Sequence, residues 1–214
     1  KTKLLNEKLR QIALQNQITP HFLFNTIENI RWKAIALTDG KNDVSTMLAK
    51  LAKMLRIGLD TTEYCVPIKK ELEHIKLYLE IQKMRYEQLI EVEYDIDESV
   101  SEASILKLTL QPIVENAIYH GIKPKGDGKI KISVHRDFSN LIVTITDNGV
   151  GIDRETLIRL NERIKDDSGF TDNHLGLWNV HQRIRNFYGE SFGILLSSDG
   201  QTGTSVSIIV PLIL

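Results

Sequence analysis

The sequence is poor in cysteine and has no long apolar run. Cys65 is the only cysteine in 214 residues, so the chain can form no intramolecular disulfide. No Cys and His spacing typical of a metal site occurs, which favours a reducing compartment and a buried structural thiol. No stretch approaches the roughly 18 consecutive apolar residues that span a bilayer, and the charged start lacks the apolar region of a signal peptide. We therefore expect the chain as given to be soluble.

An excess of charge of one sign is also missing. Lys and Arg number 27 against 28 for Asp and Glu, which gives a net charge of -1 at pH 7. No global positive field draws such a chain to nucleic acid or to anionic lipid. The pattern GxxxxGK[ST] is absent, which excludes a Walker-type phosphate cradle. We find no internal repeat and no low-complexity segment.

The first half of the chain has the periodicity of helices. Leu5, Leu9 and Ile12 already recur at helical spacing, as if a longer helix had been cut, so we expect a fragment. Pro20 interrupts this pattern and should bend the helix one residue before His21. The next elements expected are a turn at 38–43, a helix at 44–59 and a third helix that starts near Pro67.

From about residue 90 the periodicity changes to a mixture of strands and helices. EVEYDI alternates as a strand, and a helix at about 108–121 carries VENAIYH. KIKISVHRD and LIVTITD alternate around a short polar turn, which predicts a hairpin. Two helices, DRETLIRLNERI and LGLWNVHQRIRNFYG, then precede two closing strands, and Gly189 is the expected helix cap. This order predicts an α+β fold with a helix layer on an antiparallel-rich sheet.

His21 shares one helix face with polar residues. Leu14, Ile18, His21, Asn25 and Glu28 fall on that face at three- and four-residue steps. A histidine near its ordinary pKa of about 6.5 is largely neutral at physiological pH, and a neutral ring nitrogen can attack a phosphoryl group. Taken alone, a helix histidine is more often solvated or bonded within a core.

Glu115, Asn116 and His120 lie on one expected helix. Asn116 and His120 are at i and i+4, so their side chains face the same side of the helix, while the side chain of Glu115 points to the neighbouring side. Magnesium prefers oxygen ligands and keeps several waters, so the Asn116 amide oxygen plus nucleotide phosphates would make a site. An ordinary polar helix face is the alternative interpretation.

DNGVGI follows a strand directly. Gly149 and Gly151 would let the backbone approach a flat ligand closely, and Asp147 could accept a hydrogen bond from an exocyclic amine, as in adenine. A tight Asn-Gly turn is the alternative. The helix that starts near Gly176 would place free backbone amides beside a polyphosphate. Gly203 and Thr204 begin the last strand and could reach the same pocket.

Taken jointly and in order, five segments resemble the LytS/YesM-like sensor histidine kinases. They are LQNQITPHFLFNTIENIR, LQPIVENAIYHGI, DNGVGID, LGLWNVHQRI and GTSVSIIVP. The resemblance covers residues from about 14 to 211. It implies a helical dimerisation and histidine phosphotransfer domain at 1–88. An ATP-binding α/β sandwich of the Bergerat type, shared with DNA gyrase B and heat-shock protein 90, would follow at 89–214.

The resemblance also implies roles for individual residues. His21 would be the phosphoacceptor, Asn116 the magnesium ligand and Asp147 the acceptor for the adenine amine. The remaining nucleotide-binding residues expected are His120, Gly149, Gly151, Gly176, Leu177, Gly203 and Thr204. Residues from about 166 to 175 would form a lid over the nucleotide.

Two positions depart from the expected pattern. His174 stands where members usually carry a glycine, a departure that bears on lid closure and nucleotide affinity. Phe22 stands where many other histidine kinases place an acid immediately after the phosphorylated histidine. Glu115 is therefore our candidate for the general base. Asn25, one turn beyond His21, is a candidate for positioning a water or a carboxylate during phosphate removal.

The resemblance implies a kinase that transfers the γ-phosphoryl group of ATP to His21 with Mg²⁺, then passes it to an aspartate of a response regulator receiver domain. The expected partners are a second copy of the chain and that receiver, with no nucleic acid. The chain would be the cytoplasmic portion of an inner- or plasma-membrane receptor, anchored through a missing N-terminal portion. The alternatives are a non-catalytic ATP-binding regulatory dimer and a plain ATPase.

Overall fold

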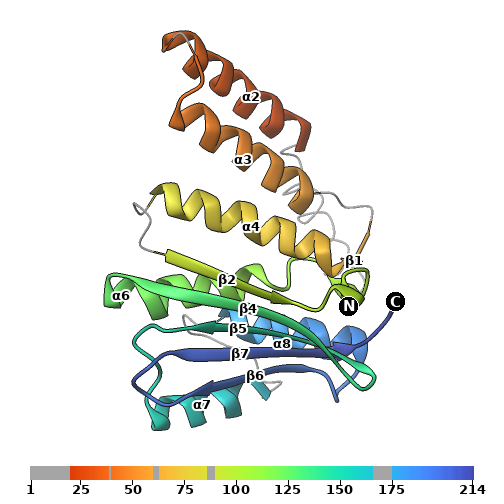
Figure 1. Cartoon of the computed structure of the whole chain (residues 1–214). Coiled ribbons are helices and arrows are strands. Elements are labelled where there is room, and N and C mark those ends of the chain that lie inside the picture. The colour runs from red at the N-terminus through yellow and green to blue at the C-terminus, as the bar shows by residue number, and fades with distance from the viewer. Residues whose placement is uncertain (1–19, 39, 60–62, 86–89, 166–174) are drawn as a thin grey trace, which may run out of the picture. The chain divides into compact units, whose positions relative to one another are not determined.

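The computed structural model describes residues 20–38, 40–59, 63–85, 90–165 and 175–214. Contacts within the chain divide it into two compact units, Lys1–Asp60 and Thr61–Leu214. The first unit contributes a pair of helices, and the second contains both sheets and all the remaining helices of the described residues (Figure 1).

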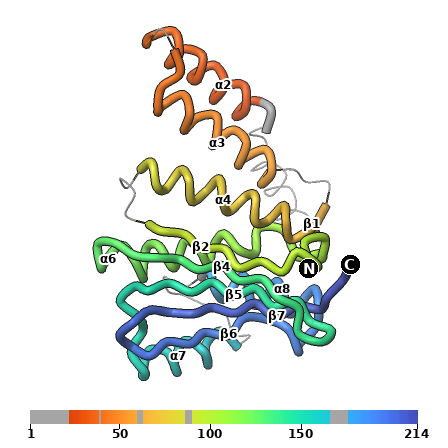
Figure 2. Tube along the Cα trace, viewed as in Figure 1, coloured from red at the N-terminus to blue at the C-terminus, as the bar shows by residue number. Residues whose placement is uncertain are grey.

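The helical unit is a hairpin of α2 (Pro20–Leu37) and α3 (Asp43–Leu59), drawn as a trace in Figure 2. Asn42 caps α3, because its Oδ1 accepts a hydrogen bond from Ser45 N at 2.8 Å while Ser45 Oγ accepts one from Asn42 N at 3.0 Å. Asn42 Nδ2 also donates to Ala34 O of α2 at 2.9 Å and ties the turn to the first helix. The turn and the second helix are as the sequence predicts.

The second unit is built on a five-stranded sheet with the order β2-β4-β5-β7-β6. Its strands are β2 (Ile90–Ile96), β4 (Gly128–Asp137), β5 (Asn140–Asp147), β6 (Gly193–Ser198) and β7 (Thr204–Pro211). β2 pairs with β4 in parallel, and every other pairing is antiparallel. The predicted hairpin is confirmed as β4 and β5, and the antiparallel-rich sheet is confirmed with it.

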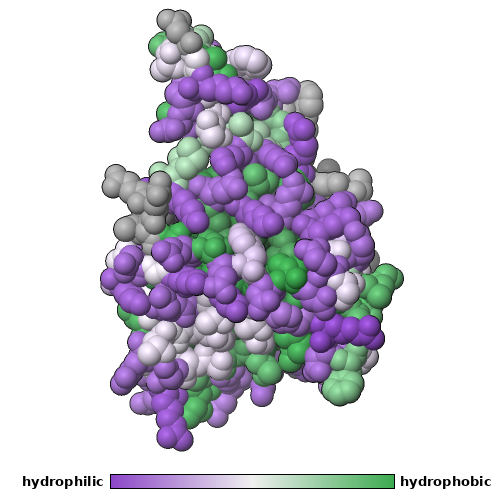
Figure 3. Space-filling model, viewed as in Figure 1, coloured by the Kyte–Doolittle hydropathy of each residue, from purple (hydrophilic) through white to green (hydrophobic). Residues whose placement is uncertain are grey.

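The two faces of this sheet differ in chemistry. One face buries an alternating apolar set against the helices, listed here by strand: Ile130, Ile132 and Val134; Leu141, Val143 and Ile145; Val206, Ile208 and Val210. The opposite face carries hydroxyl pairs, such as Thr146 with Ser205 at 2.7 Å, and ion pairs between β2 and β4, such as Lys131 with Asp95 at 3.3 Å. Figure 3 shows this side of the molecule, where hydrophilic and neutral residues outweigh the smaller apolar patches.

The helix layer consists of α5 (Gln111–Asn116), the π-helical turns of η2 (Ala117–Ile122), α6 (Lys123–Lys125), α7 (Arg154–Lys165) and α8 (Leu175–Tyr188). The sequence predicts one helix at about 108–121, and this start is wrong by three residues. Leu108 has a φ of +55°, a left-handed conformation that cannot belong to an α-helix, so α5 begins only at Gln111. The cap at Gly189 is confirmed, because its φ is +104° and its N–H bonds Arg185 O at 2.9 Å.

Helix α4 (Ile68–Arg85) packs within the second unit, together with a short ladder that the sequence did not predict. The ladder pairs β1 (Cys65–Pro67) with β3 (Ser104–Leu106) in antiparallel fashion, and these three-residue strands are too short for alternation to reveal them. The two packed units divide after Asp60, whereas the domain boundary expected from the sequence lies between residues 88 and 89. Where the functional boundary lies stays a prediction.

The close approach of Gly149 to Gly121 gives a test of this fold. A Cβ atom on Gly149 would lie 2.2 Å from the backbone carbon of Gly121. We expect Gly149→Ala to lower the free energy of unfolding by about 1–3 kcal/mol, the usual cost of overpacking, in urea denaturation.

Gly176→Ala is the matched control, because among the described residues a Cβ there would meet Pro112 Cβ at 3.7 Å and Asn116 Nδ2 at 3.9 Å, which are ordinary contact distances. Since alanine is the better helix former, this variant should unfold at the same or a slightly higher urea concentration. Equal midpoints for Gly149→Ala and the unaltered chain would contradict the packing described.

Candidate nucleotide-binding site

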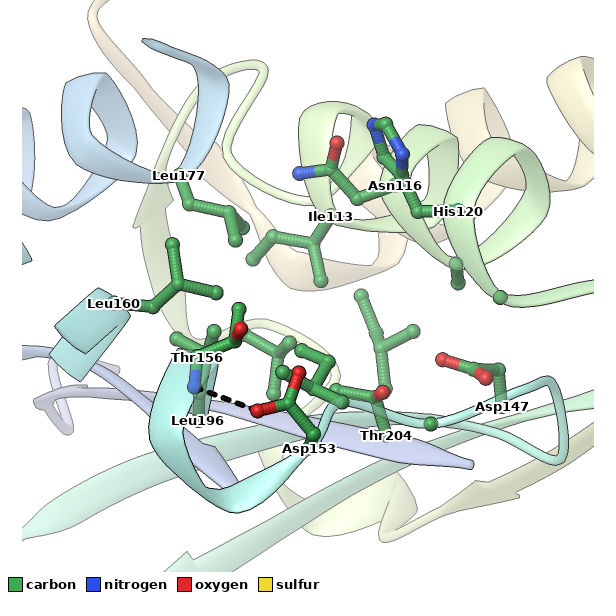
Figure 4. Close-up of a pocket in the computed structure, with 16 residues that line it drawn as sticks. Ile113, Asn116, His120, Asp147, Asp153, Thr156, Leu160, Leu177, Leu196 and Thr204 are labelled. Carbon is green, nitrogen blue, oxygen red and sulfur yellow. Dashed lines mark hydrogen bonds between the residues drawn. The ribbon is translucent and has the colours of Figure 1, made fainter. Parts of the chain in front are cut away.

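A cavity of about 230 Å³ lies between the helix layer and the sheet (Figure 4). Its lining is mostly apolar, with a few polar groups that come from different elements, the composition expected of a small-molecule site. The apolar lining comprises Ile113, Ala117, Ile145, Ile152, Leu160, Leu177, Leu196 and Val206. The polar side chains are Asn116, His120, Asp147, Asp153, Thr156 and Thr204, with Gly121 and Gly151 among them.

Asp147 is the buried acid of this cavity. It ends β5 with 5% of its surface exposed, and its Oδ1 accepts a hydrogen bond from Gly149 N at 2.8 Å. Burial raises the pKa of the Asp147 carboxyl, and hydrogen bonds from the backbone of Gly149 and Thr204 oppose that rise. A buried carboxylate that lines the cavity suits a ligand that donates a hydrogen bond, such as an exocyclic amine.

Glycines pack against both the side chain and the backbone of Asp147, because no side chain would fit there. A Cβ on Gly121 would lie 2.5 Å from Asp147 Oδ1, and one on Gly203 would lie 1.9 Å from Asp147 O. Val150 N donates to Gly121 O at 3.1 Å, so the turn after β5 is bonded directly to the π-helical turns of η2. The position of Asp147 is therefore fixed by backbone contacts on two sides.

Ser198 holds the loop after β5 to the turn between β6 and β7. Its Oγ accepts a hydrogen bond from Ile152 N at 2.9 Å and donates one to Gly203 O at 2.6 Å. Gly151, with a φ of +74°, packs against this turn. Asp153 then caps α7, since its Oδ1 accepts from Thr156 N at 2.9 Å.

Asn116 and His120 line the side of the cavity opposite the strands. In Figure 4 both project from the helical segment above the cavity, whereas Asp147 and Thr204 come from the sheet below. Asn116 ends α5, and the π-helical turns begin with the next residue. Such turns are frequent at functional sites.

The structure brings together most of the nucleotide-site residues that the sequence predicts. Asn116, His120, Asp147, Gly151, Leu177 and Thr204 all line the cavity. Gly149 and Gly203 pack directly behind it through their contacts with Gly121 and Asp147. Gly176, in the first turn of α8, lies beside Asn116. The roles assigned to these residues stay predictions.

Neither Glu115 nor Asn25 is among the described residues that line the cavity. Glu115 accepts a hydrogen bond from Gln111 Nε2 at 2.7 Å and does not line the cavity. Asn25 is exposed on α2, in the helical unit. The backbone of His21 belongs to α2, and its side chain lies outside what the structure describes. His174 and residues 166–174 of the expected lid also lie outside the described residues.

Sequence reasoning missed the apolar lining apart from Leu177, and it missed Gly121, Asp153 and Thr156 of the lining together with Ser198 behind it. Gly121 directly follows His120 in the sequence, and this adjacency was the available signal for it. Ser198 and Thr156 carry no local signal, because their roles depend on contacts with distant residues. Within the described ranges no cluster of three or more His, Cys, Asp or Glu residues could hold a metal ion.

This combination of sheet, helix layer and cavity agrees with two family models. Residues 102–214 match the histidine kinase-, DNA gyrase B-, and HSP90-like ATPases, and residues 9–90 match the histidine kinase family. The chain therefore belongs to the histidine kinase-, DNA gyrase B-, and HSP90-like ATPases, and a histidine kinase segment precedes its ATPase domain. That domain binds ATP, and the cavity is the candidate site.

Two of the similar proteins are named sensor histidine kinases. Sensor histidine kinase YesM of Bacillus subtilis is 34% identical over 200 residues, which are 93% of this chain and 33% of that protein. Sensor histidine kinase YpdA of Escherichia coli is 35% identical over 214 residues, 96% of this chain and 36% of that protein. The chain thus spans about a third of the length of these relatives. The resemblance to LytS/YesM-like sensor histidine kinases is confirmed.

Solved structures support the fold. The histidine kinase domain from Erythrobacter litoralis EL346 blue-light activated histidine kinase matches with a TM-score of 0.51 at 15% identity, over 98% of this chain and 93% of that one. The catalytic domain of histidine kinase ThkA matches with a TM-score of 0.52 at 18% identity, over 69% of this chain and 95% of that one. The predicted fold class, a helical part followed by an α/β sandwich, is confirmed.

None of the helices in the described ranges combines the length and the apolar character needed to cross a membrane.

The Asp147 carboxylate can be tested by substitution. Asp147→Asn keeps an oxygen for the bond from Gly149 N but replaces the other oxygen with a hydrogen-bond donor, which would face the donating amine of adenine. We expect the affinity for ATP to fall by about 10- to 100-fold in titration calorimetry, the range for losing a hydrogen bond to a charged group.

The control is Asp137→Asn, at the exposed end of β4, which removes the same charge far from the cavity lining. Its ATP affinity should equal that of the unaltered chain. Unchanged binding by Asp147→Asn would exclude Asp147 as the group that binds the purine.

Proposed function

We propose that this chain is the catalytic core of a sensor histidine kinase, which transfers the γ-phosphoryl group of ATP to His21. The observation that carries the proposal is the buried carboxylate of Asp147 in an apolar cavity that also contains Asn116. An enzyme that transfers a phosphoryl group works mainly by positioning and by charge stabilisation. The cavity supplies a place to hold ATP, and α2 supplies the nucleophile.

ATP binding would use two chemically distinct parts of the cavity. The Asp147 carboxylate accepts a hydrogen bond from the adenine amine, while apolar side chains such as Ile113 and Leu160 enclose the base. The amide oxygen of Asn116, together with the phosphates, would hold Mg²⁺, which supplies neutralisation of the phosphate charge. Gly176 would lie near the phosphates because it lies beside Asn116.

In the transfer step a neutral ring nitrogen of His21 attacks the γ-phosphorus. A nitrogen–phosphorus bond forms, the bond to the β–γ bridging oxygen breaks, and ADP leaves with that electron pair. The proton on the other ring nitrogen must then be lost to a base. Phe22 follows His21 and has no group that accepts a proton. Glu115 is therefore the base we propose, and Asn25 is proposed to position a water or carboxylate during phosphate removal.

The partners follow from the same proposal. The described part of the helical hairpin exposes large apolar side chains, with Ile30 48% and Trp32 60% exposed, which supports a homodimer formed through these helices. One solved structure similar to this chain contains histidine kinase ThkA in complex with response regulator protein TrrA. We propose a receiver aspartate as the next acceptor here as well. Membrane anchoring of the whole protein and a cytoplasmic place for this part also stay proposals.

A regulatory ATP-binding dimer without kinase activity is the second candidate. Phe22 favours it, because this side chain occupies the place of the expected acid and is 64% exposed. Tight ATP binding without any phosphohistidine would select this candidate.

The kinase proposal predicts a labelled histidine. Incubation with Mg²⁺ and γ-labelled ATP should give label that is lost in acid and kept in alkali, as expected for a phosphohistidine. His21→Gln should abolish this label, because the nucleophilic ring is gone. The control His135→Gln removes an exposed histidine of β4 and should retain full labelling. Label that persists in His21→Gln would show that another residue is the acceptor.

The magnesium proposal predicts a second effect. Addition of Mg²⁺ should tighten the binding of a non-hydrolysable ATP analogue, and Asn116→Ala should remove most of that gain while binding in EDTA stays the same. The control is Asn179→Ala, an exposed asparagine of α8 that does not line the cavity. A full magnesium gain in Asn116→Ala would exclude Asn116 as the ligand.

A further inference from the structure

A buried glutamate of α4 binds the backbone that leads into α5. Glu71 is 2% exposed, and its Oε1 accepts a hydrogen bond from Leu108 N at 2.7 Å. Its Oε2 accepts from Thr109 N at 3.0 Å and from Leu110 N at 3.3 Å. These three N–H groups are consecutive and immediately precede α5 (Gln111–Asn116). The capping group for this helix therefore comes from a different helix.

The geometry of this segment depends on the carboxylate. Leu108 adopts a φ of +55°, which is strained for a residue with a branched side chain and persists only where its surroundings fix it. That conformation turns successive N–H groups toward a common point, an arrangement that binds an anion. Burial raises the pKa of the Glu71 carboxyl, and the three backbone donors and the nearby charge of Arg183 oppose the rise.

Arg183 of α8 holds the other side of the same segment. Its Nη2 donates to Lys107 O at 2.6 Å and its Nη1 donates to Leu108 O at 3.3 Å. The N–H groups of the segment thus bind an acid from α4, and its carbonyls bind a guanidinium from α8. Two helices that are distant in sequence fix one short stretch of backbone.

This stretch is attached to the candidate nucleotide site on both sides. Helix α5 carries Ile113 and Asn116, which line the cavity, and α8 carries Leu177, which also lines it. Asp147, by contrast, is positioned by the sheet and by Gly121 and Gly149. A shift of residues 107–110 would therefore act first on the part of the cavity with Asn116 and Ile113, while Asp147 keeps the supports that come from the sheet and from Gly149.

We propose that Glu71 and Arg183 are positioning residues that set the place of Asn116 through the start of α5, and so connect α4 to the affinity for Mg²⁺-nucleotide. The inference rests on the proposed role of Asn116 as the magnesium ligand. It concerns residues that do not touch the nucleotide. Glu71 lies in the segment that matches the histidine kinase family at residues 9–90, although it packs in the ATP-binding unit.

The test measures the affinity for a non-hydrolysable ATP analogue by titration calorimetry, once with Mg²⁺ and once with EDTA. For Glu71→Gln we expect the magnesium-dependent gain in affinity to fall about tenfold, because the amide offers the three donors one oxygen in place of a carboxylate. Affinity in EDTA should fall less than affinity with Mg²⁺, since Asp147 keeps its supports in the sheet although Ile113 moves with α5. Arg183→Lys keeps the charge but loses the fork that binds two carbonyls, and should lower the gain in the same direction.

Two comparisons separate positioning from a general loss of structure. Glu73→Gln removes an exposed carboxylate from the same helix and should bind like the unaltered chain under both conditions. Glu71→Gln combined with Asn116→Ala should lose no more of the magnesium gain than Asn116→Ala alone, because Glu71 acts through Asn116.

The inference is overturned if Glu71→Gln weakens binding equally with and without Mg²⁺, which a structural role alone would produce, or if it keeps the full gain. Should Glu71→Gln fail to fold, as judged by circular dichroism, Arg183→Lys decides by the same criteria. If Asn116→Ala lowers the gain and neither of these variants does, only the present inference fails. A full gain in Asn116→Ala would overturn the magnesium role and this inference together.

Discussion

A contact between two glycine backbones, Gly121 and Gly149, holds the helix layer against the end of β5. Any Cβ on Gly149 would overlap the backbone of Gly121, and Val150 N is bonded to Gly121 O at 3.1 Å. Asp147 depends on this contact, because its carboxylate fills the space left beside Gly121 and is bonded by Gly149 N. Without the contact between Gly121 and Gly149, the Asp147 carboxylate would lose both the space it fills and the hydrogen bond from Gly149 N. Burial would then strongly disfavour its charged form.

The candidate site is therefore supported by two sets of contacts, which meet at Gly121. Strand β5, the glycines and Ser198 fix the part that contains Asp147, through bonds within the sheet and its turns. The part that contains Asn116 is supported by a helix start, where Glu71 and Arg183 bind consecutive backbone groups. The part with Asn116 thus depends on two side chains from helices distant in sequence, whereas the part with Asp147 depends on the sheet, its turns and the glycine backbones.

The sequence predicts the local parts of this site and misses those that depend on distant contacts. Asp147 could be predicted because a strand, an acid and a glycine turn follow one another, and Asn116 because its neighbours lie at helical spacing. Glu71 could not, since the donors that it binds lie more than thirty residues further along the chain. The helix expected at 108–121 begins late for the same reason: the left-handed conformation of Leu108 is imposed by tertiary contacts, and a leucine gives no sign of it. Ser198 is a third such case. In the sequence it is an ordinary strand serine, and only the structure shows that its Oγ accepts a hydrogen bond from Ile152 N.

The placement of α4 bears on how a signal would reach the ATP site. Family similarity assigns residues 9–90 to the histidine kinase segment, yet α4 (Ile68–Arg85) packs with the ATP-binding unit. The histidine kinase segment is thus connected to the ATP-binding unit in two ways. One is the continuous backbone, and the other is the set of hydrogen bonds from the start of α5 to the Glu71 carboxylate. Phosphoryl transfer requires little covalent chemistry from the protein, so its rate depends mainly on how well the reactants are positioned. A helix that belongs by similarity to the histidine kinase segment and by contact to the ATP-binding unit would then affect that positioning through Glu71, which does not line the cavity.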